Sequence, residues 1–99
     1  MMTISKTQAD NEMLLELSGR LDTTTAPELE AEINSAPDGV TFLTLDFSGL
    51  EYLSSAGLRV LLMAQKKMSS LGGMTVKNVN ETIMEVFQIT GFSDILTIE

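Results

Sequence analysis

The sequence predicts an α/β fold: one domain with a four- or five-stranded mixed, largely parallel sheet and helices packed against it. Two observations carry this prediction. Strand-like and helix-like segments alternate with short connections after an initial pair of strands, which favours right-handed crossovers. Residues 40–47 are almost continuously apolar and β-branched or aromatic, as in a strand buried on both faces. The 99 residues fit a single domain, 1–99.

The first two elements are predicted to be strands. Residues 2–8 alternate weakly and are rich in β-branched side chains, which indicates an edge strand. Residues 9–11 supply turn chemistry, and residues 12–18 form the returning strand, with Leu15 and Leu17 on one face.

The first helix is expected to begin at Thr25. Glu28 follows at capping-box spacing, and Pro27 stands in the first turn, where a missing N–H costs little. Leu29 and Ile33 share one face, and residues 37–39 (Pro-Asp-Gly) end the helix.

The central segments are predicted as strand 40–47, a connecting loop 48–53 and a helix 55–71 ended by two glycines. Strand 74–79, a helix capped by Asn80 and closed by Gly91, and a short strand 95–98 complete the chain. The side chains expected in the core include Leu45, Leu58, Leu61, Leu62 and Val76.

The composition excludes most catalytic chemistry. The chain has no histidine and no cysteine, so serine and cysteine nucleophiles lack their usual base, and zinc and copper lack their usual ligands. No phosphate-binding glycine loop and no calcium-binding loop is present. We expect no catalytic residues, no cofactor site and no metal site, and therefore no enzyme.

The charge distribution limits the partners. The net charge is −8, which disfavours nucleic acid. Residues 52–80 hold four basic and no acidic residues, so this segment carries +4 and the remainder −12. These charges either keep the domain soluble and complement the helix dipoles, or they leave a face free of negative charge on which a partner docks. No apolar run approaches a membrane span, and residues 1–12 lack the features of a secretory signal, so a cytoplasmic location without membrane insertion is expected.

The most informative stretch is residues 46–61. A buried strand ends, a loop turns, and Ser54, Ser55, Ala56 and Gly57 open a helix. Free N–H groups and the positive end of the helix dipole lie at such a start, so a phosphate on a serine there is electrostatically accommodated. On physical grounds alone, Ser54 also fits a simple N-cap and Ser55 an ordinary first-turn residue.

This stretch resembles the signature of the STAS domain family, the anti-sigma-factor antagonists. Matching positions include Asp46, Ser48, Leu50, Tyr52 and Gly57–Leu58. The resemblance continues upstream in Gly19-Arg20-Leu21-Asp22 and downstream in Gly91-Phe92, so that it covers nearly the whole chain. Ser54 departs from the family's aspartate and Ala56 from its second small hydroxyl residue.

The resemblance implies a single STAS-like domain that binds an anti-sigma factor with serine kinase activity. The protein is released when it is phosphorylated on Ser55 (alternatively Ser54), and a serine phosphatase is a further partner. The partner-binding surface is expected to comprise Asp22, Thr23, Ser54, Ser55, Ala56, Gly57 and Arg59. Some members are instead non-phosphorylated interaction subunits, for example of a lipid transporter, and this alternative stays open.

Overall fold

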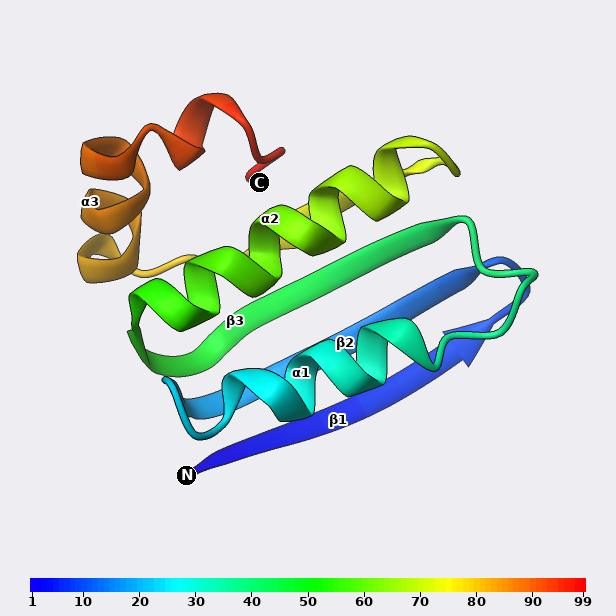
Figure 1. The fold of residues 1–99 in the computed structure, drawn as a ribbon, viewed down its shortest axis with the longest axis horizontal. Coiled ribbons are helices and arrows are strands. Elements are labelled where there is room, and N and C mark those ends of the chain that lie inside the picture. Colours follow the sequence, from blue (N-terminus) through cyan, green and yellow to red (C-terminus); the bar gives the residue numbers. More distant parts are fainter.

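The computed structural model describes residues 1–99 and confirms the α/β class with a four-stranded mixed sheet. Strand order in the sheet is β1-β2-β3-β4; β1 and β2 are antiparallel, and the other pairs are parallel. Figure 1 shows the sheet with α1 and α2 across one face. The elements are β1 (Met2–Ala9), β2 (Glu12–Leu21), α1 (Ala26–Asn34), β3 (Phe42–Leu53), α2 (Ser55–Ser69), β4 (Gly73–Lys77), α3 (Glu81–Thr90) and the 3₁₀ turn Phe92–Asp94.

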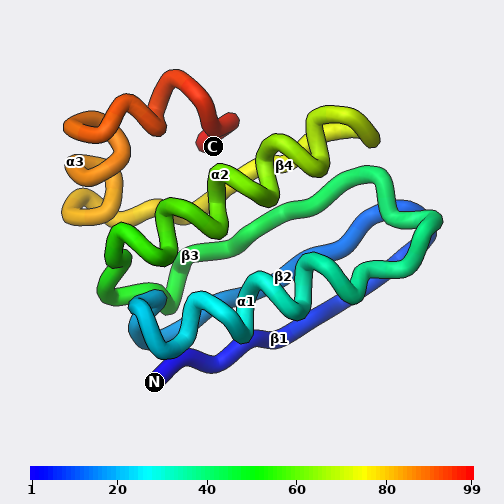
Figure 2. The backbone as a smooth tube through the Cα atoms, in the orientation of Figure 1, coloured from blue at the N-terminus to red at the C-terminus, as the bar shows by residue number.

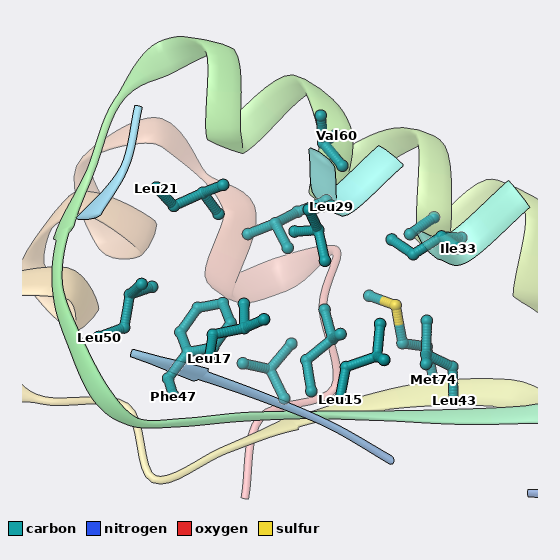
Figure 3. Close-up of a cluster of buried hydrophobic side chains, with 14 of the residues drawn as sticks. Leu15, Leu17, Leu21, Leu29, Ile33, Leu43, Phe47, Leu50, Val60 and Met74 are labelled. Carbon is teal, nitrogen blue, oxygen red and sulfur yellow. The ribbon is translucent and has the colours of Figure 1, made fainter. Parts of the chain in front are cut away.

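The core lies between the sheet and the helices. Alternate residues of the central strands point inward, so Leu15 and Leu17 of β2 meet Leu43 and Phe47 of β3 beneath the helices (Figure 3). Leu45, Leu61 and Val76 are fully buried, as predicted.

The prediction assigned too many residues of α2 to the core. Its buried residues are Gly57, Val60, Leu61, Ala64 and Met68. Leu58 is only partly buried against the core, and Leu62 stays partly exposed on the outer side of the helix. A helix lying on a sheet buries one stripe, and Leu62 falls beside that stripe rather than on it.

The predicted loop 48–53 is wrong, because these residues continue β3. β3 stays paired with β2 through two register shifts, which place Ser18 opposite Gly49 and Leu21 opposite Leu53. A Cβ on Gly49 would lie 2.6 Å from the Ser18 Cβ, so only glycine allows the strands this approach. The extension carries β3 to the point where α2 begins.

The predicted fifth strand 95–98 is reduced to one bridge. Ile98 pairs with Val76 in parallel, and the Val76 N–H donates to the Thr97 carbonyl. The 3₁₀ turn holds the preceding residues, since the Leu96 N–H donates to the Phe92 carbonyl, which leaves too little chain for a strand. None of the helices is both long enough and apolar enough to cross a membrane.

Candidate partner-binding site

The start of α2 distinguishes its two serines. Ser54 is the N-cap in an extended conformation, and its Oγ accepts a hydrogen bond from the Gly57 N–H at 3.5 Å. The Ser54 N–H donates to the Leu21 carbonyl at 2.9 Å, which ties the cap to the end of β2. Ser55 is exposed in the first turn, and its hydroxyl makes no hydrogen bond within the chain. The two adjacent hydroxyls therefore differ: one is engaged in the cap and the other is free.

Gly57 lets the first turn of α2 sit directly on the strand ends. A Cβ at this position would lie 2.6 Å from Leu53 Cδ1 and 2.8 Å from Leu21 Cγ. Gly57 itself is buried. It therefore sets the height of the helix above the sheet, and a partner does not reach it.

The loop after β2 is organised by Asp22. Its Oδ1 accepts hydrogen bonds from the Thr24 hydroxyl at 2.8 Å, the Thr24 N–H at 3.0 Å and the Thr25 N–H at 3.2 Å. The Thr24 hydroxyl bond lowers the pKa of Asp22 most; partial desolvation opposes it, and the backbone N–H groups add to the lowering. The loop thus holds an ionised carboxylate at the sheet edge.

The capping box predicted for Thr25 and Glu28 does not form. The Thr25 hydroxyl donates to the Arg20 carbonyl at 2.7 Å and accepts from the Asp22 N–H at 2.8 Å. These bonds turn it away from the helix, and Thr25 makes no side-chain cap. The residue closes the loop instead.

The Asp22 loop and the start of α2 lie side by side, as the parallel pairing of β2 and β3 predicts (Figure 2). A groove of about 390 Å³ runs between α1 and α2 from this point. Its lining brings together three of the predicted site residues, Thr23, Ala56 and Arg59. Asp22, Ser54 and Ser55 do not line the groove, although Asp22 and Ser55 are the chain neighbours of Thr23 and Ala56. Of the predicted site residues only Gly57 is buried.

Arg20 and Tyr52, which are not among the predicted site residues, also lie at this end of the sheet. The Arg20 guanidinium lies 4.1 Å from the centre of the Tyr52 ring, and its Nε is 3.8 Å from Asp22 Oδ2. Both residues face each other across β2 and β3. An arginine stacked on a half-exposed tyrosine is typical of interface anchors, and here it also braces the Asp22 loop.

Asp46, at one of the family-like positions, is structural. Its Oδ1 accepts from the Ser48 N–H at 2.9 Å and from Asn78 Nδ2 at 3.0 Å. Burial alone would raise the pKa of Asp46, but the bonds from Asn78 and Ser48 and the charge of Lys77 outweigh it and lower the pKa. Asp46 therefore fastens the end of β4 to β3 behind the site.

Comparison with known proteins identifies the fold family. Residues 4–97 match the family model described as Mlab, STAS domain. The chain belongs to the STAS domain family. BtrV of Bordetella bronchiseptica, described as a candidate anti-sigma factor antagonist, is 32% identical over 99 residues, which is 98% of this chain and 85% of BtrV.

Solved structures agree with this assignment. The crystal structure of an anti-sigma factor antagonist from Mycobacterium paratuberculosis matches with a TM-score of 0.88 and 26% identity, over 99% of this chain and 85% of that one. The Bacillus cell fate determinant SpoIIAA in its phosphorylated form shares the fold, with a TM-score of 0.77 and 21% identity over 98% of this chain and 91% of that one.

Proposed function

We propose that this STAS domain is an anti-sigma-factor antagonist switched by phosphorylation. The unmodified chain binds an anti-sigma factor that is a serine kinase, and the sigma factor is thereby free to direct transcription. The kinase supplies ATP and the catalytic groups, and phosphorylates Ser55. The phosphorylated chain is released, and a serine phosphatase restores it. The cycle takes place in the cytoplasm, where sigma factors act.

The observation that carries the choice of Ser55 is the difference between the two serine hydroxyls. A kinase needs a hydroxyl that can approach its ATP, and Ser55 is exposed with no internal hydrogen bond. Ser54 Oγ caps the helix, and phosphorylating it would break the cap and crowd the Leu21 backbone beside it. Relatives named as anti-sigma factor antagonists support the wider function.

The position of Ser55 also suits a reversible switch. A phosphate in the first turn of α2 faces the positive end of the helix dipole, which favours the modified domain by roughly 0.3–1 kcal/mol. The helix has no acidic residue in its first turn to oppose it. The fold therefore tolerates the phosphate, and its effect falls on the partner across the interface.

The test is phosphorylation of the purified chain by its cognate anti-sigma kinase with ATP, followed by intact-mass analysis. The parent should gain one phosphate, Ser54→Ala should gain it too, and Ser55→Ala should gain none. Ser48→Ala, which removes another exposed serine hydroxyl from the middle of β3, is the control and should be modified like the parent. Loss of phosphate uptake in Ser54→Ala, with uptake retained in Ser55→Ala, contradicts the assignment.

The rival function is a non-phosphorylated interaction subunit, for example of a lipid transporter. The matching family model is described as Mlab, STAS domain, and this description is the observation that favours the rival function. It predicts that protein purified from its own cells has the same intact mass before and after phosphatase treatment. The proposed switch predicts a phosphatase-sensitive fraction.

A further inference from the structure

The exposed side of α2 presents two basic residues flanking two apolar ones. Arg59, Leu62, Met63 and Lys66 follow at helical spacing, and we call this set the α2 stripe. Arg59 and Lys66 are exposed, Leu62 and Met63 partly so, and together they line a hollow of about 350 Å³. Arg59 and Met63 also line the groove between α1 and α2, so the stripe is continuous with the proposed site.

The two cations of the α2 stripe have no internal partner. The ion pairs of the chain join Lys6 to Glu32 and Arg20 to Asp22. The neighbouring Lys67 is used differently, since its Nζ donates to the Ile33 carbonyl at the end of α1. The helix contains no acidic residue, although the chain outside residues 52–80 carries −12. The stripe is thus a small positive surface on a strongly acidic molecule.

We propose that the α2 stripe docks an acidic surface with an apolar centre on the anti-sigma factor; this inference rests on the proposed function. Lys66 follows Arg59 by seven positions, which is about 10 Å along a helix. The complementary surface carries two carboxylates at about that separation, with apolar side chains between them to cover Leu62 and Met63.

Charge complementarity determines how such a partner approaches. An acidic surface is repelled by most of this chain and attracted at the α2 stripe, so the charges steer it into one orientation before contact. Like-charge repulsion elsewhere suppresses the wrong orientations. An anionic membrane fits the α2 stripe less well than an acidic protein surface, because two cations on a chain of net charge −8 give little attraction to a lipid surface.

The experiment measures association and dissociation rates between the full chain and its cognate anti-sigma factor at low and high salt. Lys66→Gln removes one charge from the stripe. Lys77→Gln is the matched control, since it removes one charge from β4, opposite Asp46 in the sheet. Leu62→Ala truncates the apolar centre, and Ile89→Ala is its control on α3, where Ile89 is 86% exposed.

At low salt, Lys66→Gln should slow association several-fold and Arg59→Gln/Lys66→Gln by about tenfold, while Lys77→Gln stays within about twofold of the parent. High salt should remove these differences. Leu62→Ala should speed dissociation about fivefold or more, whereas Ile89→Ala leaves it unchanged. Melting temperatures close to that of the parent show that each variant is folded.

Equal association rates for Lys66→Gln and Lys77→Gln overturn this inference while leaving the proposed function intact. Stripe-dependent binding to phosphatidylglycerol vesicles, with no loss toward the anti-sigma factor, overturns it in favour of a membrane. A parent chain that binds no anti-sigma factor overturns the proposed function, and this inference with it.

Discussion

Substituting Gly57 by alanine tests whether tight packing sets the position of α2. Alanine is favoured over glycine inside a helix by about 1 kcal/mol, so on helix propensity alone Gly57→Ala stabilises the domain. The added Cβ, however, would lie 2.6 Å from Leu53 Cδ1 and 2.8 Å from Leu21 Cγ, distances that force one of them to move. Both leucines are buried in the core, at 7% and 0% exposure, so neither moves freely.

Overpacking of this kind costs typically about 1–3 kcal/mol. The helix propensity offsets part of that cost, and we expect Gly57→Ala to lose roughly 1 kcal/mol in free energy of unfolding. The assay is urea unfolding, with Gly39→Ala as the control, because a Cβ on Gly39 meets nothing within 4 Å. A Gly57→Ala variant more stable than the parent by about 0.5 kcal/mol or more would refute the packing argument.

Three further outcomes follow from the structure. Leu61→Ala should cost roughly 2–5 kcal/mol, because Leu61 is fully buried on the inner face of α2; a urea-unfolding loss below about 0.5 kcal/mol contradicts that burial. In the folded chain the pKa values of the Asp22 and Asp46 carboxyl groups are lowered below 3.8. The stability that these two carboxylates contribute is therefore complete above that pH, and it is lost as the pH falls toward their pKa values in the folded chain. The urea concentration at the unfolding midpoint should accordingly fall as the pH is lowered below about 4. This fall should be less steep in Asp46→Asn than in the parent. Tyr52→Ala, which removes the ring under Arg20, should weaken binding to the anti-sigma factor more than it changes the melting temperature; an equal affinity excludes this pair from the interface.

Features fixed by short-range chemistry were predictable from the sequence. Asn80 caps α3, with its Oδ1 accepting from the Ile83 N–H at 2.8 Å, and Gly91 ends the helix with a φ of 82°. The adjacency of the Asp22 loop and Ser54 was also predictable, because it follows from parallel strands ending at one edge.

Features that depend on distant partners were not predictable. Residues 48–53 have the polar and glycine content of a loop, and they become strand only because β2 continues beside them. The Thr25 hydroxyl fits a cap locally but bonds the Arg20 carbonyl in the folded chain. Arg20 meets Tyr52 only after the second register shift between β2 and β3, which no local pattern reveals.

The central claim is that a phosphate on Ser55 acts on the interface and not on the fold. A unit-charge pair about 4 Å apart at an effective dielectric of about 20 repels by roughly 4 kcal/mol, which is nearly a thousandfold in affinity. The most direct measurement is the Kd of the cognate anti-sigma kinase for the unmodified and the Ser55-phosphorylated chain, with the melting temperature of each. We predict a Kd about a thousandfold weaker after phosphorylation and melting temperatures within a few degrees. An unchanged Kd, or a phosphorylated chain that melts far below the unmodified one, would contradict the account.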